Sequence, residues 1–229
     1  MVICVAGPIA AGKNFVCSIL EERGFFCLDA DQEIHKIIGD KQAEIFSRFS
    51  QIAASRGINL RAADGSLDRR ALGKLLFKDS ALLAEQEKIL YPEFVARTQK
   101  LIDANKNALQ AQDAAQKEKG FTGQNAGGSG QPIAVGQPAR GLAINAALLY
   151  KTPSLLRQCQ KIIYVDAPLL VRAWRIRRRD RLPLSQIIRR IKSQKGLLKE
   201  YERFAADYGI EMVRVWNWGS ACQTLEGLS

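Results

Sequence analysis

The sequence is poor in the residues that build metal clusters, disulfide frameworks and membrane spans. Its five cysteines are scattered and none stands in a CxxC pair, so neither a zinc site nor a disulfide scaffold is expected. His35 is the only histidine, so a histidine-based triad or metal site would depend on one residue. No apolar run approaches the roughly 18 residues that a membrane span needs. The first residues also lack the basic and apolar regions of a signal peptide, and we expect a cytoplasmic protein.

What the chain has in excess is positive charge. Its 229 residues include 34 Lys and Arg against 23 Asp and Glu, for a net charge of +11. A chain this basic is expected to bind polyanions: nucleotides, nucleic acid or an acidic membrane surface. Most of the excess is local, because residues 172–203 hold twelve Lys or Arg and three acids, a net charge of +9. The charge therefore indicates a concentrated patch rather than a uniformly basic surface.

Short apolar segments alternate with helical segments, which predicts a single α/β domain over residues 1–229 with a parallel five-stranded sheet flanked by helices. The expected strands cover residues 2–6, 25–28, 141–149, 161–166 and 211–216. Helices are expected over residues 13–23, over the arginine-rich stretch 169–203, and after the last strand. The core of the domain is then formed by about residues 1–31 and 141–229.

Two regions separate the halves of this core. Residues 32–103 are mostly helical in pattern, with a helix beginning after Asp68, and Pro92 should interrupt or kink the chain there. Residues 104–140 are rich in Gln, Ala, Gly and Asn and have little to bury. We expect a helix extension that frays into a flexible surface insertion, rather than a functional peptide motif.

The strongest local motif is Gly7-Pro8-Ile9-Ala10-Ala11-Gly12-Lys13, which matches the GxxxxGK core of a phosphate-binding loop. The glycines allow the backbone to bend so that successive N–H groups face phosphate oxygens, and the following helix presents its positive end to them. Lys13 can reach the outer phosphates and neutralise charge during phosphoryl transfer. The alternative is a glycine turn that only links a strand to a helix. The predicted nucleotide contacts are Gly7, Ala10, Ala11, Gly12, Lys13, Asn14 and Phe15.

Asn14 departs from this motif. The pattern has Ser or Thr after the lysine, because that hydroxyl coordinates Mg²⁺. An amide oxygen is a hard ligand that could bind Mg²⁺ directly or through water, and it could also fail to do so. Asn14 is therefore a candidate metal ligand and the most informative departure in the loop.

Asp29 and Asp31 follow the second expected strand, at the edge of the sheet that also carries the phosphate loop. One carboxylate can take a proton from an attacking hydroxyl, and the other can hold a metal ion or its bound water. Asp31 is the predicted catalytic base because it projects one residue further into the cleft, and Asp29 is the predicted metal ligand. The alternative is that Asp31 only caps the helix that follows.

Arg175 and Arg179 are four residues apart and share a helix face within the basic stretch 172–203. Such a face could close over the nucleotide as a lid, with its guanidinium groups on the phosphates. The alternatives are a solvated basic helix and a nucleic-acid patch. The stretch has little of the aromatic interleaving that single-stranded nucleic acid requires, so nucleic-acid binding is the weaker alternative.

The order of these features resembles the dephospho-CoA kinase family, P-loop kinases of the nucleoside-monophosphate-kinase type. The resemblance covers nearly the whole chain apart from residues 104–140. Beyond the phosphate loop it rests on Leu28-Asp29-Ala30-Asp31, Gly65-Ser66-Leu67-Asp68-Arg69, Val165-Asp166-Ala167-Pro168 with Arg175 and Arg179, Arg190-Ile191-Lys192-Ser193-Gln194, and Val215-Trp216-Asn217-Trp218-Gly219.

The resemblance implies a P-loop kinase fold with helical substrate-binding and lid segments. It also implies ATP-dependent phosphorylation of the ribose 3′-hydroxyl of dephospho-CoA, the last step of coenzyme A synthesis. ATP, Mg²⁺ and dephospho-CoA would be its small-molecule partners, and the protein would be a monomer or weak oligomer. The implied catalytic residues are Asp31, Lys13 and Arg175, with Arg179 on the nucleotide and Asp29, Arg69 and Tyr91 on the substrate.

Three departures from the family pattern leave alternatives open. Asn14 replaces the hydroxyl residue, and Tyr91-Pro92 stands where the family usually has His-Pro. The segment from Ala147 to Lys151 replaces Pro-Leu-Leu-Phe-Glu, with the loss of a proline and the exchange of an acid for a lysine. A catalytically impaired nucleotide-binding homologue and another small-molecule kinase on the same fold are therefore the alternative functions.

Overall fold

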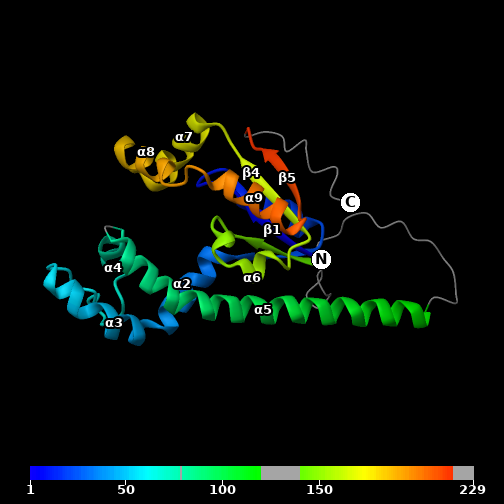
Figure 1. The fold of residues 1–229 in the computed structure, drawn as a ribbon, viewed down its shortest axis with the longest axis horizontal. Coiled ribbons are helices and arrows are strands. Elements are labelled where there is room, and N and C mark those ends of the chain that lie inside the picture. The colour runs from blue at the N-terminus through cyan, green and yellow to red at the C-terminus, as the bar shows by residue number, and fades with distance from the viewer. Residues whose placement is uncertain (78, 120–139, 219–229) are drawn as a thin grey trace. The chain divides into compact units, whose positions relative to one another are not determined.

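The computed structural model describes residues 1–77, 79–119 and 140–218 (Figure 1). For residues 112–119 it describes the backbone alone. The chain forms two compact units. One unit joins Met1–Asp29 to Gln99–Ser229, and the other is Ala30–Thr98. The first unit holds the sheet and the phosphate loop, whereas the second is helical.

The sheet of the first unit has five strands in the order β2-β3-β1-β4-β5. Every neighbouring pair is parallel, so the predicted parallel five-stranded sheet is confirmed. The strands are β1 (Val2–Ala6), β2 (Phe25–Asp29), β3 (Gly141–Asn145), β4 (Lys161–Asp166) and β5 (Glu211–Trp216). All five residues of the central strand β1 are buried, which is typical of a strand covered by helices on both faces.

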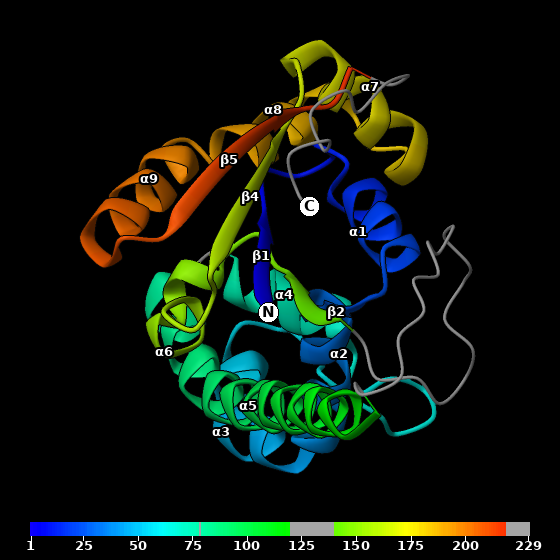
Figure 2. The ribbon, with the colours of Figure 1, turned by 90° about the vertical axis from the view of Figure 1, so that its right-hand side faces the viewer.

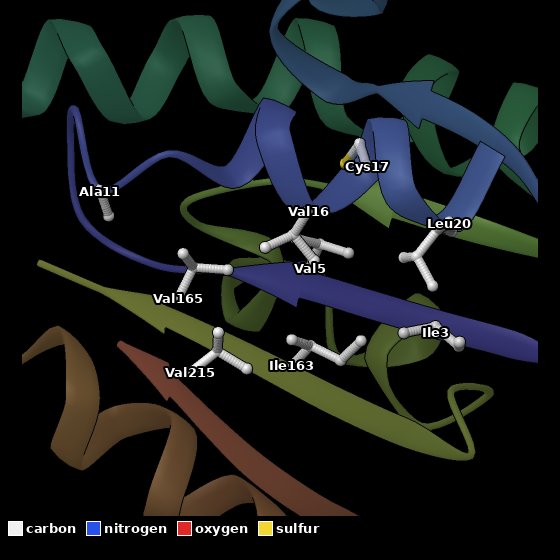
Figure 3. Packing of buried hydrophobic residues seen from close by; sticks show 10 residues of the cluster. Ile3, Val5, Ala11, Val16, Cys17, Leu20, Ile163, Val165 and Val215 are labelled. Atoms are coloured by element: carbon white, nitrogen blue, oxygen red, sulfur yellow. The ribbon is translucent and has the colours of Figure 1, made fainter. Parts of the chain in front are cut away.

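Helices cover both faces of this sheet, with α1 (Lys13–Glu22) and α9 (Leu197–Tyr208) on opposite sides (Figure 2). Val16 and Leu20 of α1 pack on alternate residues of the strands, among them Ile3, Val5 and Ile163 (Figure 3). On the other side, the ring of Tyr201 lies 6.0 Å from the ring of Tyr164 in β4. The period of two along each strand thus divides the core between two helical layers.

The segment after β3 differs from the prediction. The strand ends at Asn145 rather than continuing to residue 149, and a turn leads into the 3₁₀-helix η1 (Leu149–Lys151) and α6 (Pro153–Leu156). The backbone here bonds to Tyr201 instead of to a neighbouring strand: Leu149 N–H donates to the Tyr201 hydroxyl over 3.0 Å. An apolar run alone could not distinguish this turn from a longer strand.

The arginine-rich stretch forms three helices, not one: α7 (Leu169–Asp180), α8 (Leu184–Lys192) and α9. Arg181 adopts a left-handed conformation with φ +52° just before Pro183, and this ends α7. Gly196, with φ +87°, stands immediately before α9. Two short breaks therefore turn the predicted stretch into separate elements.

The second unit contains α2 (Ala30–Asp40), α3 (Gln42–Ser55), α4 (Arg69–Leu76) and the first part of α5 (Ser80–Lys119). The predicted helix start at Asp68 is confirmed, because its carboxylate accepts hydrogen bonds from the N–H groups of Arg70 and Ala71. Of the two predicted effects of Pro92, an interruption or a kink, the interruption is wrong, since α5 continues through the proline. Buried Leu90 and Phe94 flank the proline and hold this part of the helix by packing.

Helix α5 runs on from the second unit into the first and reaches Lys119, so the predicted helix extension beyond residue 104 is confirmed. The remainder of the predicted insertion, residues 120–139, lies outside the described residues, as do the predicted last helix and Cys222. Cys4, Cys17 and Cys159 are free and buried, whereas Cys27 is free and only half-buried. Over the described ranges, no helix has the length and apolar character needed to cross a membrane.

Tyr201→Phe tests the bond that fixes the turn after β3. The change leaves the buried Leu149 N–H without its acceptor, and we expect a loss of about 1–3 kcal/mol of unfolding free energy, measured by urea denaturation. Tyr208→Phe in the same helix is the control, because the Tyr208 hydroxyl is exposed and accepts a hydrogen bond from Arg157. Equal losses in the two variants would show that the Tyr201 hydroxyl does not support the turn.

Candidate functional site

The phosphate loop lies at the carboxyl end of β1, where the connections after neighbouring strands run to opposite faces of the sheet. The connection after β1 runs into α1 on one face, whereas the connection after the neighbouring β3 runs toward η1 and α9 on the other. Open α/β sheets bind their ligands where the connections after adjacent strands diverge to opposite faces, as they do here. The position of the motif within the fold therefore agrees with a binding site.

Both glycines of the loop have conformations and surroundings that exclude a side chain. Gly7 has φ +145°, and a Cβ atom on it would lie 2.1 Å from the carbonyl oxygen of Val165 in β4. Gly12 has φ +99°, and its Cβ would lie 2.0 Å from Nδ2 of Asn217. Ala10 between them also adopts a positive φ, +60°. The loop is thus a tightly packed turn of mixed handedness, the backbone form that gathers N–H groups around an anion.

Lys13 lies over this loop. Its ammonium group donates hydrogen bonds to the carbonyl oxygens of Gly7 at 3.0 Å and Pro8 at 3.5 Å. Gly12 is the residue that precedes α1, so the first N–H groups of the helix follow the loop directly. Phe15, in the first turn of α1, is exposed. The positive end of the helix and the lysine therefore lie together at the loop.

Four side chains from the region beyond β4 hold the loop in shape, and we call them the loop clamp: Arg172, Arg175, Gln194 and Asn217. Arg172 Nε donates to the Ile9 carbonyl at 3.0 Å, and Gln194 Oε1 accepts from the Ile9 N–H at 2.7 Å. Arg175 donates to the carbonyls of Ala10 and Ala11 at 3.1 and 3.2 Å and to Asn217 Oδ1 at 3.2 Å.

Arg175 was expected on the nucleotide as part of a lid, and it lies on the loop that would hold the nucleotide. Arg172, Gln194 and Asn217 were missed as site residues. Gln194 and Asn217 stand in the two C-terminal motifs of the resemblance, and this signal could have singled them out. Nothing local in the sequence distinguishes Arg172 from its basic neighbours.

Arg172 is the most deeply placed charge of the loop clamp. Only 9% of its surface is exposed, and its Nη2 atom is buried without a hydrogen-bond partner among the described residues. Burial lowers the pKa of its guanidinium group, against the opposite pull of Asp166 and Tyr164. Burial and the charge of Asp166 raise the pKa of Tyr164 to about 12. The base of the loop is therefore a polar environment with little exposed surface.

Arg179 is placed differently from Arg175. It forms a two-pronged ion pair with Asp180, with distances of 2.7 and 3.1 Å, and Arg190 of α8 joins the same carboxylate at 3.0 Å. These arginines lower the pKa of Asp180. The shared face predicted for Arg175 and Arg179 thus carries two functions, one toward the loop and one that links α7 to α8.

Asn14 and Asp29, the predicted metal ligands, both lie beside Asn145 at the end of β3. Asn145 Nδ2 donates to Asn14 Oδ1 at 2.9 Å. Asp29 is the register partner of Asn145 across β2 and β3. Asn145 was missed from the sequence, although a polar residue at the end of an apolar strand is a signal that could have found it. Within the described residues, no three His, Cys, Asp or Glu side chains gather as a metal cluster.

The remaining predicted residues belong to the second unit. Helix α2 begins at Ala30, so Asp31 lies in its first turn. Arg69 is the first residue of α4. Tyr91 lies on α5 and donates its hydroxyl to Glu87 at 3.1 Å.

Known proteins are similar to this chain in sequence and in fold. A model of the dephospho-CoA kinase family matches residues 1–113. The dephospho-CoA kinase of Treponema denticola is 33% identical over 207 residues, which cover 90% of this chain and 79% of the relative. The chain belongs to the dephospho-CoA kinase family. The resemblance inferred from the motifs is therefore confirmed.

A second relative of this dephospho-CoA kinase family member agrees with that assignment, and a solved structure shares its fold. The dephospho-CoA kinase of Treponema pallidum is 34% identical over 194 residues, 85% of this chain and 78% of the relative. A crystal structure of TT1252 from Thermus thermophilus is 21% identical, with a TM-score of 0.62 over 96% of this chain and 90% of that one. The latter shows a shared fold.

Gly12→Ala tests the close approach of the loop to Asn217 in this family member. Gly196 also precedes a helix with a positive φ, but the space beside it is open, so Gly196→Ala is a matched control for backbone strain alone. We expect both variants to lose about 1–2 kcal/mol of unfolding free energy from strain. Gly12→Ala should lose about 1–3 kcal/mol more from overpacking, measured by urea denaturation.

A double variant identifies the contact. In an Asn217→Ala background the clash is removed, so the extra cost of Gly12→Ala over Gly196→Ala should shrink by about 1 kcal/mol or more. An extra cost that is unchanged in that background would contradict the contact as its cause.

Proposed function

We propose that this chain transfers the γ-phosphoryl group of ATP to the ribose 3′-hydroxyl of dephospho-CoA and releases coenzyme A and ADP. The observation that carries the proposal is a GxxxxGK loop that is packed against β4 and held by Arg175 in a member of the dephospho-CoA kinase family. ATP and dephospho-CoA are the proposed small-molecule partners.

The loop would bind the triphosphate of ATP through its backbone N–H groups and the start of α1. Lys13 would exchange its bonds to the Gly7 and Pro8 carbonyls for the outer phosphates, since both are hydrogen-bond acceptors within reach of one flexible side chain. Arg175 donates hydrogen bonds to the loop carbonyls of Ala10 and Ala11 and so adds positive charge beside the loop. These groups stabilise the charge that spreads over the transferring phosphoryl oxygens.

Mg²⁺ is proposed as the accompanying metal ion, and the side chains near the loop agree with its chemistry. Asn14 and Asp29 supply an amide and a carboxylate oxygen on either side of Asn145, and Mg²⁺ prefers such hard oxygen ligands together with water and phosphates. When bound, the ion would neutralise charge on the phosphates that the loop holds.

Asp31 is proposed as the general base. Its carboxylate would take the proton from the 3′-hydroxyl as the oxygen bonds to the γ-phosphorus and the bond to the bridging oxygen of ADP breaks. Arg69 and Tyr91, at the start of α4 and on α5, would bind the acceptor from the same helical unit.

The test is coenzyme A formation by the purified full chain with ATP, Mg²⁺ and dephospho-CoA. We expect ADP and coenzyme A to appear in equal amounts, and the Lys13→Ala variant to fall by about 100-fold or more because the charge on the outer phosphates is lost. Product formation no greater than that of the Lys13→Ala variant would contradict the proposal. ADP release without coenzyme A would instead indicate another acceptor.

Asp31→Asn tests the base. The amide keeps the shape of the side chain but cannot accept the proton, so we expect turnover to fall by about 100-fold or more while ATP affinity stays within about twofold. Asp40→Asn, at the exposed end of the same helix, is the matched control and should keep near-normal turnover. Near-normal turnover in Asp31→Asn would assign the proton transfer to another group.

A further inference from the structure

The contact between Asn14 and Asn145 bears on how the nucleotide is bound. P-loop enzymes commonly hold Mg²⁺ between the Ser or Thr hydroxyl after the loop lysine and an Asp carboxylate from a neighbouring strand. Asn14 stands in the first of these positions, immediately after Lys13. Asn145 ends β3, the strand beside β1, and thus occupies the corresponding edge of the sheet. Both positions carry neutral amides in this chain.

The two amides are bound to each other in a fixed arrangement. Asn145 is only 7% exposed, and its Nδ2 donates to Asn14 Oδ1 at 2.9 Å. The next residue, Ala146, donates its N–H to the Val5 carbonyl at 3.1 Å, which ties the end of β3 to the strand that enters the loop. The Asn14 oxygen that would serve a metal ion is therefore already an acceptor in a bond to a buried side chain.

The charge at this position follows from the amides. A carboxylate in place of Asn145 would repel metal-free triphosphate and would attract a divalent cation through its full negative charge, whereas a neutral amide does not repel the triphosphate and attracts the cation only through its dipole. Asp29 is the register partner of Asn145 and supplies a carboxylate on the adjacent strand. Compared with the usual Asp at the end of the neighbouring strand, Asn145 nevertheless removes one full negative charge beside the loop. The loop backbone and Lys13 still attract the phosphates.

We propose that the Asn14–Asn145 amide pair makes ATP binding by this loop nearly independent of Mg²⁺. The inference rests on the proposed binding of ATP by the phosphate loop and adds a specificity determinant to it. The chain would accept metal-free nucleoside triphosphate about as well as the Mg²⁺ complex, and a divalent ion would enter with the phosphates instead of being held beforehand by the protein.

The test is the dissociation constant of ATP for the full chain by titration calorimetry, once with excess EDTA and once with Mg²⁺. We expect the two constants to differ by less than about threefold. In Asn145→Asp, metal-free binding should weaken by about tenfold or more through repulsion, and Mg²⁺ should restore it. A wild-type constant that improves tenfold or more on adding Mg²⁺ would overturn the inference, as would Asn145→Asp that behaves like wild type.

Two further measurements keep the test decisive if Asn145→Asp does not fold. Asn14→Ser changes an exposed residue, removes the amide pair and supplies a hydroxyl, so its ATP binding should become more dependent on Mg²⁺ than that of wild type. Mn²⁺ alone, followed by electron paramagnetic resonance, should show no saturable binding to the nucleotide-free wild-type chain. Saturable Mn²⁺ binding there, or no change in Asn14→Ser, would count against the inference.

These outcomes separate the inference from the proposed function. If ATP binds neither with EDTA nor with Mg²⁺, the proposed function fails and the inference fails with it. If ATP binds only with Mg²⁺, the proposed function stands and the inference alone is wrong.

Discussion

The structure depends on how closely the phosphate loop approaches the strands beside it. Gly7 leaves no room for a Cβ atom against the carbonyl of Val165, and Gly12 leaves none against Asn217. Both neighbours come from the chain beyond residue 160 and reach the loop only because β4 pairs with β1 and β5 pairs with β4. The shape of the seven-residue motif near the N-terminus is thus fixed by β4 and β5, which come late in the sequence.

This dependence changes the meaning of the basic charge. The excess of Lys and Arg between residues 172 and 203 indicated a lid that closes over phosphates. Two of these arginines instead hold the loop carbonyls, and another two share the carboxylate of Asp180. Part of the basic patch therefore holds the phosphate loop through its carbonyl oxygens. A guanidinium group can do this at a carbonyl-rich turn because its donors form a rigid fork.

The sequence was sufficient wherever the signal was local. The apolar segment Val2–Ala6, the glycine motif after it and the Asp68 cap each depend on neighbouring residues, and each was predicted at its place. The family could also be predicted from the sequence, because its motifs are short and occur in a fixed order. The core of the site, residues 7–14, followed from one of these motifs.

The partners of that site could not be predicted, because they are defined by the fold. Asn145 meets Asn14 across 131 positions of sequence, and Gln194 meets Ile9 across 185. The end of β3 was misplaced for a similar reason: its turn is satisfied by the distant Tyr201 hydroxyl. Pro92 was judged by its local effect on a helix, whereas buried neighbours decided the outcome.

The central claim of this account is that contacts from the C-terminal half of the first unit shape the loop before any nucleotide arrives. Amide hydrogen exchange of the nucleotide-free chain tests it most directly. Ile9 N–H is bonded to Gln194 and Ala11 N–H to the Pro8 carbonyl, so both should exchange slowly, with protection of about 100-fold or more over an unstructured peptide. Exchange at the rate of an unstructured peptide, slowed only when ATP is added, would contradict the account.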